Sequence, residues 1–309
     1  MATPTFDTTV FYESQGEALA RAFVLAAPRE SVDREELATW RIDGRVVGPT
    51  CRYSSTLQAR IPLAHRGLMP WGDRLAIAAE AAIPDPCYWS TELPFLYRAI
   101  GEIVIDSTTR VPIDQTFGMR TLSIVRKKIA LNGKLWVPRG VRREVVVGNA
   151  PLELWRETDT VMVVDDPDEE LCREASEIGV LIIARSSQNE PASLNVCQRL
   201  GRHPSVVIIS LNANGFAESG MHRIAPNSLF AQTFDVFRDL IVVARDSQLG
   251  LFEFQKHEQD ACTSLADSDP KPAVFLRGTG KRSLVEARAA CDRLQADLAG
   301  KCDAAGFIV

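Results

Sequence analysis

Hydrophobic and polar positions divide the chain into two parts with different periodicities. Up to about residue 120 there are short apolar runs, several of which alternate with polar positions at a period of two, and no long helical pattern interrupts them. This alternation is typical of strands with one buried face. Asp43–Gly44 is one of the turn signals between the runs. We therefore predict an antiparallel β-sandwich of about a hundred residues.

The second part has buried apolar strands separated by helical patterns. Its strands are predicted at Val161–Val164, Val180–Ala184, Val206–Ser210, Leu240–Ala244, Leu251–Phe254, Ala273–Leu276 and Gly306–Val309, with Val141–Val147 as the eighth. Such alternation favours a parallel sheet covered on both faces. Eight βα units make a TIM barrel, and an open doubly wound sheet is the alternative. The barrel is reduced, because about 170 residues replace the ~250 that are typical.

Two helices in this part have clear end signals. The first follows Val161–Val164, with Asp166 as the candidate N-cap and Gly179 as the closing residue. The second begins with the capping box of Ser283 and Glu286, and Gly300 ends it.

Composition narrows the classes of partner. The net charge is −5, and positive and negative residues are mixed along the chain. The sequence has no basic stripe, so we do not expect nucleic acid as a partner. No apolar run is long enough to span a membrane. The start, MATPTFDTTV, lacks the basic and apolar regions of a signal peptide, which favours a cytoplasmic location.

Cysteine and histidine give no pattern of a metal or cofactor site. The seven cysteines are odd in number and form no CxxC pair, so buried, reduced thiols are expected rather than disulfides or zinc ligands. The four histidines are scattered and do not pair at ligand spacing. We therefore expect no metal and no cofactor.

The junction between the two parts carries a family resemblance. YWSTELPFLYRAIGEIVID resembles the segment that closes the immunoglobulin-like domain of glycoside hydrolase family 2, the β-galactosidase, β-glucuronidase and β-mannosidase family. The matching residues are Trp89, Ser90, Glu92, Pro94, Leu96 and Tyr97. Further matches, in order, are Phe117-Gly118-x-Arg120, Leu131-Asn132-Gly133-Lys134 and Arg139-Gly140-Val141. The resemblance implies an immunoglobulin-like β-sandwich over residues 8–120, followed by a reduced (β/α)8 TIM barrel over 121–309.

The same resemblance points to missing catalytic groups. Retaining glycosidases need two carboxyl groups roughly 5–5.5 Å apart, a nucleophile and an acid/base. The family supplies the acid/base after its fourth barrel strand, in a Ser-Leu-Gly-Asn-Glu pattern, where this chain has Asn214. It supplies the nucleophile after the seventh strand, where this chain has Arg277. The family normally begins with a sugar-binding jelly-roll domain, and we expect no room for one in this sequence.

Other residues near the strand ends are candidates for the chemistry. Glu218 and Asp246 are the possible substitute carboxylates, although solvated loop charges are the simpler interpretation. The arginines Arg139, Arg142 and Arg143 lie at the start of the first strand, and the last two replace the family's polar Asn and His. They could line the barrel mouth and bind an anionic sugar or phosphate, or have a structural role paired with acidic neighbours.

Three hypotheses follow. The first is a degenerate family 2-like protein, a pseudoenzyme with a carbohydrate-binding or scaffold role. The second is an active retaining β-glycosidase that hydrolyses O-glycosyl bonds with the relocated carboxylates Glu218 and Asp246. The third is a non-catalytic assembly module, because the apolar C-terminal GFIV leaves a barrel edge for an oligomer or a partner chain to cover. The first is favoured.

Overall fold

The computed structural model describes residues 3–14, 18–71, 74–126, 128–186, 199–211, 241–243, 250–253, 273–276, 280–299 and 304–309. The chain forms two compact units. Among the described residues, the first unit holds those up to Trp89 together with Leu93–Met119. The second holds Ser90–Glu92 and those from Arg120 onward. In this part of the chain, no helix is long and apolar enough to cross a membrane.

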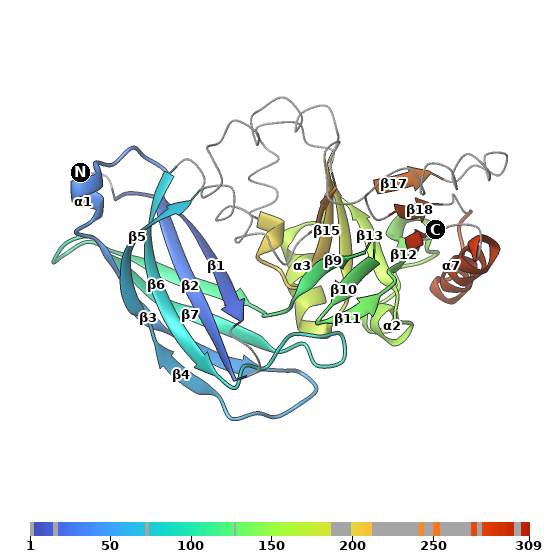
Figure 1. The fold of residues 1–309 in the computed structure, drawn as a ribbon, viewed down its shortest axis with the longest axis horizontal. Coiled ribbons are helices and arrows are strands. Elements are labelled where there is room, and N and C mark those ends of the chain that lie inside the picture. The colour runs from blue at the N-terminus through green and yellow to red at the C-terminus, as the bar shows by residue number, and fades with distance from the viewer. Residues whose placement is uncertain are drawn as a thin grey trace. The chain divides into compact units, whose positions relative to one another are not determined.

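The first unit is a sandwich of two four-stranded antiparallel sheets (Figure 1). One sheet has the order β1 (Phe6–Ser14), β2 (Leu19–Pro28), β6 (Arg74–Pro84) and β5 (Ala64–Trp71). The other has the order β4 (Ala59–Pro62), β3 (Arg41–Thr50), β7 (Leu96–Val104) and β8 (Arg110–Phe117). A single helical turn, α1 (Arg34–Leu37), precedes β3. The prediction of a β-sandwich is confirmed, and the strand order is that of immunoglobulin-like sandwiches with one added strand.

Alternating side chains of both sheets form the core between them. The core includes Val24, Ile42, Ile77, Ile103 and Ile113, all almost fully buried. Tyr97, at the start of β7, is also buried there, and its hydroxyl oxygen accepts a hydrogen bond from the backbone N–H of Cys87 at 2.9 Å. Burial raises the pKa of Tyr97 to about 12. A tyrosine bonded to the preceding backbone at this position is a recurrent feature of immunoglobulin-like sandwiches.

Asp43–Gly44 is not a turn, and this corrects the sequence prediction. Both residues lie within β3, where Gly44 is paired with Gly101 of β7. A Cβ atom on Gly44 would lie 2.4 Å from the carbonyl oxygen of Ile100. Glycine is therefore required here by the close approach of two strands, a constraint that looks the same as a turn signal in the sequence.

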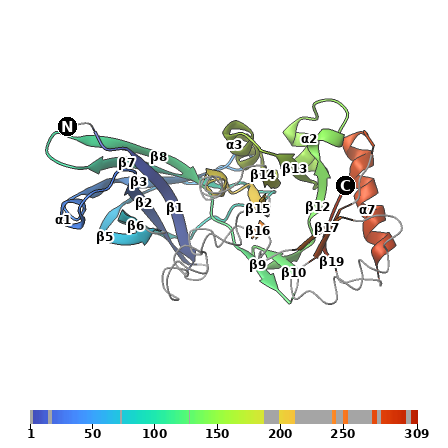
Figure 2. The ribbon, with the colours of Figure 1, turned by 90° about the horizontal axis from the view of Figure 1, so that it is seen from above.

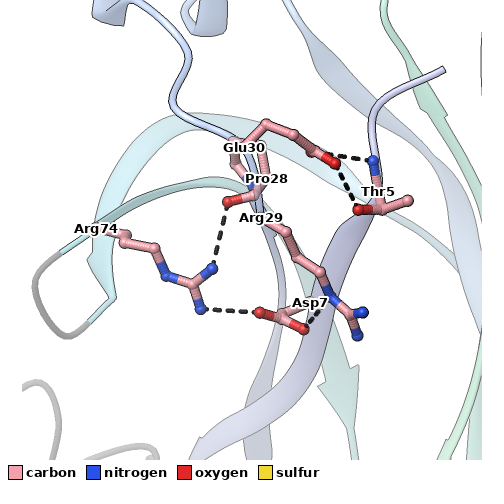
Figure 3. Close-up of polar contacts among 6 residues, drawn as sticks. All are labelled: Thr5, Asp7, Pro28, Arg29, Glu30 and Arg74. Carbon is pink, nitrogen blue, oxygen red and sulfur yellow. Dashed lines mark hydrogen bonds and ion pairs between the residues drawn. The ribbon is translucent and has the colours of Figure 1, made fainter. Parts of the chain in front are cut away.

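A polar cluster joins β1, β2 and β6 (Figure 3). The carboxylate of Asp7 accepts hydrogen bonds from Arg29 Nε at 2.8 Å and from Arg74 at 2.9 Å. Burial raises the pKa of Asp7, but the hydrogen bonds from Arg74 and Arg29 outweigh it and leave this pKa below its ordinary value. Arg74 also donates to the carbonyl of Pro28 and lies 5.2 Å from the ring centre of Trp71. These contacts tie β1, β2 and β6 together, which gives the cluster a structural role.

The second unit contains an eight-stranded sheet in which every described pairing is parallel. Its strands are β12 (Arg139–Arg142), β13 (Val161–Asp165), β14 (Ile182–Ser186), β15 (Val206–Leu211), β16 (Ile241–Val243), β17 (Gly250–Glu253), β18 (Ala273–Leu276) and β19 (Ala304–Ile308). Their spatial order is β16-β15-β14-β13-β12-β19-β18-β17. The first strand therefore pairs with the last, and the sheet curls into a partial barrel (Figure 2).

Helices and a small sheet complete this unit. Its described helices include η1 (Arg143–Val145), α2 (Leu152–Glu157), α3 (Glu169–Ile178) and α7 (Leu284–Leu298). Its antiparallel three-stranded sheet comprises β9 (Leu122–Val125), β10 (Lys128–Leu131) and β11 (Lys134–Trp136). The predicted capping box of Ser283 and Glu286 is confirmed at the start of α7, whereas Gly300 lies outside the described residues. Helix α7 packs on β12 and β19 (Figure 2).

The N-cap of α3 is Asp168, not Asp166. The carboxylate of Asp168 accepts a hydrogen bond from the backbone N–H of Leu171 at 2.8 Å. Asp166 instead has a left-handed backbone with a φ of 42°, and its N–H donates to the carbonyl of Arg185 at 2.7 Å. The end of the sheet thus engages Asp166, and the helix begins two residues later than predicted. Gly179 closes α3 as predicted, with a φ of 92°.

Candidate functional site

In sheets of parallel strands, functional groups lie at the carboxyl ends of the strands, which makes that end of the sheet the candidate site. The described strands that end in a charged residue are β12 with Arg142, β13 with Asp165 and β17 with Glu253. Arg185 precedes the last residue of β14. Neither Arg185 nor Glu253 was named as a candidate from the sequence. Both could have been found there, since each stands at the polar end of an apolar strand.

The two arginines of β12 lie on opposite faces of the sheet. Arg139 Nε donates to Gln295 Oε1 at 3.1 Å and is 3.3 Å from a carboxylate oxygen of Asp292, both in α7. Side chains alternate along a strand, so Gly140 and Arg142 lie on the other face. A Cβ atom on Gly140 would lie 2.9 Å from Cγ1 of Ile308, which marks this face as the concave interior of the curled sheet.

Arg142 is held at the carboxyl end of β12 on that interior face. Its backbone N–H donates to the carbonyl of Val309 at 2.8 Å, which fixes the strand end. Its side chain is 22% exposed, and its Nε is buried without a hydrogen-bond partner. Glu144 Oε1 lies 4.0 Å from this nitrogen, too far for a hydrogen bond. A buried guanidinium N–H without an acceptor is a donor that a bound oxygen could satisfy.

The predicted cluster of three arginines is not formed, because backbone alternation separates its members. Arg139 contacts α7, Arg142 faces the interior, and Arg143 begins the turn η1 with an exposed side chain. Arg139 fits the structural role, because it is paired with an acidic neighbour. The anion-binding role fits the position of Arg142 and, at the surface, that of Arg143.

An ion pair accompanies Arg142 on the interior face. Arg142 is in register with Val163, two residues before Asp165, and Asp165 is in register with Arg185. The carboxylate of Asp165 lies 3.3 Å from Arg185 Nε, and both side chains are about half exposed. Two cations and one anion therefore occupy the carboxyl ends of three adjacent strands. Such a group can bind the hydroxyl and acidic groups of a ligand.

Four predicted site positions lie outside the described residues: Asn214, Glu218, Asp246 and Arg277. The strands that lead to two of them are described. The fourth strand of the sheet, β15, ends at Leu211, and the seventh, β18, ends at Leu276.

Buried titratable groups in this unit have environments that suit structural roles. Burial raises the pKa of Cys172 and of Cys291 to about 12, so both remain neutral thiols. Burial lowers the pKa of His203 to about 4, so this imidazole is uncharged near neutral pH. Over the described ranges, no three His, Cys, Asp or Glu residues are grouped as metal ligands would be.

The amino ends of the strands have a different character. Arg156 Nε donates to the carbonyl of Thr91 at 2.8 Å, and Arg156 Nη2 donates to the carbonyl of Glu92 at 3.1 Å. Arg120 is buried, with Nε and Nη2 each 2.6 Å from a carbonyl oxygen, those of Pro204 and Val206. Both guanidinium groups therefore donate their hydrogen bonds to the protein's own backbone.

Comparison with known proteins connects this fold to one family. No protein-family model and no curated protein sequence matches the chain. Among solved structures, it is similar to a glycosyl hydrolase family 2 member from Bacteroides cellulosilyticus, with a TM-score of 0.61 and 13% identity over 98% of this chain and 43% of that one. It is also similar to β-glucuronidases from Parabacteroides merdae and Bifidobacterium dentium.

For the Parabacteroides merdae enzyme the TM-score is 0.57 and the identity 14%, over 98% of this chain and 47% of that chain. For the Bifidobacterium dentium enzyme, which was solved with coumarin-3-O-glucuronide, the values are 0.56 and 14%, over 98% and 59%. The chain thus spans about half the length of the structures it matches. A likeness over nearly the whole of this chain shows that it has a fold like that of glycosyl hydrolase family 2 proteins.

Proposed function

We propose that the chain is a family 2-like protein that binds a carbohydrate at the carboxyl ends of its parallel strands and does not hydrolyse it. The sheet is then a reduced TIM barrel whose mouth holds the sugar. The fold supports a carbohydrate-related role, and Arg142 with the Asp165–Arg185 pair supplies polar groups for sugar hydroxyls.

One observation carries the loss of catalysis. The resemblance assigns the acid/base to the end of the fourth barrel strand and the nucleophile to the end of the seventh. In this chain β15 is the fourth strand and ends three residues before Asn214. The seventh strand, β18, ends immediately before Arg277. This agreement of strand ends with the sequence alignment supports Asn214 and Arg277 as the replacements.

Neither replacement can perform the two-carboxylate reaction. An amide such as Asn214 does not protonate a leaving oxygen, and a guanidinium cannot attack the anomeric carbon. A positive charge at Arg277 would also oppose the oxocarbenium-like transition state. Binding groups at the strand ends do not depend on either residue, so sugar binding can persist without turnover.

Hydrolysis of 2,4-dinitrophenyl β-glycosides tests this proposal. The galactoside, glucuronide, mannoside and glucoside should be used, because this leaving group needs no acid and only a nucleophile is required. We expect no release of dinitrophenol above the rate of heat-inactivated protein.

Turnover that disappears in Glu218→Gln or Asp246→Asn, and persists in Glu157→Gln, would overturn the proposal. It would establish the alternative, an active glycosidase with relocated carboxylates. Glu157 is a suitable control because it is an exposed carboxylate at the end of α2.

A further inference from the structure

Two loops at the carboxyl end of the sheet are joined by backbone hydrogen bonds. The N–H of Val147, after η1, donates to the carbonyl of Arg282 at 2.7 Å. The N–H of Arg282 donates to the carbonyl of Val145 at 2.9 Å, and Val146 and Arg282 form a parallel bridge. The loop that follows β12 is therefore fixed against the segment that precedes α7. Their side chains are presented together without the entropy cost of ordering two free loops.

Positive charge is concentrated on these joined loops. The basic edge, as we call it, consists of Arg143, Lys281 and Arg282. Arg143 and Lys281 are exposed, and within the described part of the chain neither has an ion-pair partner. The edge is thus positive in a chain whose net charge is −5.

Two nearby glutamates offset part of the positive charge in this region. Glu144 Oε1 lies 4.0 Å from Arg142 Nε, within ion-pair distance, and Arg282 interacts electrostatically with Glu286. Glu286 is used in the capping box of α7, where its Oε2 accepts hydrogen bonds from Ser283 N at 3.0 Å and Ser283 Oγ at 2.8 Å. At least Arg143 and Lys281 therefore remain available to an external anion.

The exposed apolar residues beside the basic edge, and the lack of aromatic residues there, narrow the class of partner. Val147 and Val285 are 61% and 60% exposed and flank the basic residues in sequence. Such surfaces can pack against the C–H faces of sugar rings. Single-stranded nucleic acids are bound by basic grooves that also carry aromatic stacking residues. The stretches 142–148 and 280–286 contain no aromatic residue, which disfavours a single-stranded nucleic acid as the partner.

We propose that the basic edge binds the acidic groups of an anionic polysaccharide, outside the sugar position at the strand ends. This inference rests on the proposed carbohydrate-binding function and adds to it the class of ligand. Carboxylate and sulfate groups have the same chemistry toward arginine and lysine, so the experiment must distinguish them.

Affinity electrophoresis of the full chain tests the proposal. Gels should contain polygalacturonate, dextran sulfate or neutral dextran at low salt. We expect retardation by one or both polyanions, none by neutral dextran, and weaker retardation at higher salt. Retardation by polygalacturonate alone would identify carboxylates as the ligand groups, and retardation by dextran sulfate alone would identify sulfates.

The double variant Arg143→Ala/Lys281→Ala should bind about five-fold more weakly, since each exposed charge pair contributes modestly. The control Arg45→Ala/Arg60→Ala removes the same charge from two exposed arginines of the sandwich and should bind like the wild type. Equal loss in both variants would show only a net-charge effect and overturn the inference. No retardation of the wild type, or tighter binding of a single-stranded oligonucleotide than of either polyanion, would overturn it too.

Failure of this inference is distinguishable from failure of the proposed function. Binding of small glycosides that persists without polyanion binding leaves the proposed function intact. Turnover of dinitrophenyl glycosides removes the proposed function whatever the electrophoresis shows.

Discussion

Arginines at the two ends of the parallel strands are held in opposite ways. At the amino ends, Arg120 and Arg156 donate to backbone carbonyls at 2.6–3.1 Å. At the carboxyl ends, Arg142 keeps a buried Nε without an acceptor, and Arg143 is exposed. The same side chain therefore stabilises the fold at one end and is available for binding at the other. This separation of stability from function is typical of barrels built from parallel strands.

The largest expected effect is at Arg120, which tests whether the amino end carries stability. Arg120→Met leaves the carbonyls of Pro204 and Val206 without their charged donor. We expect the free energy of unfolding to fall by about 4 kcal/mol, because each hydrogen bond to a charged group contributes about 2 kcal/mol. Urea unfolding measures this loss. Arg143→Met is the matched control and should change stability by no more than about 0.5 kcal/mol.

Two glycines with positive φ sharpen the same comparison. Gly179 has a φ of 92°, and a Cβ atom there would lie 2.5 Å from the carbonyl oxygen of Thr91. Gly148, near the carboxyl end, has a φ of 76° and no heavy atom within 4 Å of that position. We expect Gly179→Ala to cost about 3 kcal/mol and Gly148→Ala about 1 kcal/mol in urea unfolding. Equal costs would mean that backbone conformation alone, and not crowding at the amino end, decides the effect.

His203, just before β15, predicts a pH dependence of stability. Burial lowers its pKa to about 4, so it stays neutral in the folded protein at pH 5. In the unfolded chain, the imidazole has an ordinary pKa of about 6.5 and takes up a proton as the pH falls. The contribution of this group to the free energy of unfolding is therefore fully present above pH 6.5 and is lost as the pH falls toward 4.

Between pH 7 and pH 5, protonation of His203 in the unfolded chain should lower the free energy of unfolding by about 2 kcal/mol. His203→Gln should remove that part of the pH dependence when urea unfolding is compared at the two values. An unchanged pH dependence in the variant would contradict the buried, neutral state of this histidine.

The smallest expected effect compares the two arginines of β12. Arg139→Met breaks the contacts with Gln295 and Asp292 and should lower the free energy of unfolding by about 1 kcal/mol. Arg142→Met removes a side chain whose Nε makes no hydrogen bond and only a 4.0 Å ion pair with Glu144, and should change the free energy of unfolding by no more than about 0.5 kcal/mol. If Arg142→Met is the more destabilising variant, Arg142 is a structural residue and not a binding group.

Local patterns predict most of the parallel strands, but not every element or its ends. The strand predicted at Val141–Val147 is instead β12 (Arg139–Arg142) followed by the turn η1, and the small sheet of β9, β10 and β11 has no counterpart in the prediction. The capping box of Ser283 and Glu286 was read correctly, because all of its information lies in four consecutive residues. The sequence predicts Asp166 as the N-cap, but the backbone N–H of Asp166 donates to the carbonyl of Arg185, a tertiary contact that the local pattern does not contain. The sequence likewise predicts a turn at Asp43–Gly44, but Gly44 is required by the close approach of Gly101 on another strand.

The candidate site was harder to predict than the fold. The sequence showed that Arg139, Arg142 and Arg143 are close along the chain, but not that α7 would engage the first of them. The Asp165–Arg185 pair depends on the register of two strands, which the sequence did not specify. The roles of Asn214 and Arg277 stay predictions, since they rest on the resemblance and on where β15 and β18 end.

Saturation-transfer NMR on the methyl β-glycosides of galactose, glucuronic acid, mannose and glucose tests the central claim most directly, because one sample reports both binding and hydrolysis. We predict transfer to at least one intact glycoside, its loss in Arg142→Met, its retention in Arg156→Met, and no free sugar after overnight incubation. Release of free sugar, or transfer that depends on Arg156 and not on Arg142, would contradict a non-hydrolytic binding site at the carboxyl ends of the strands.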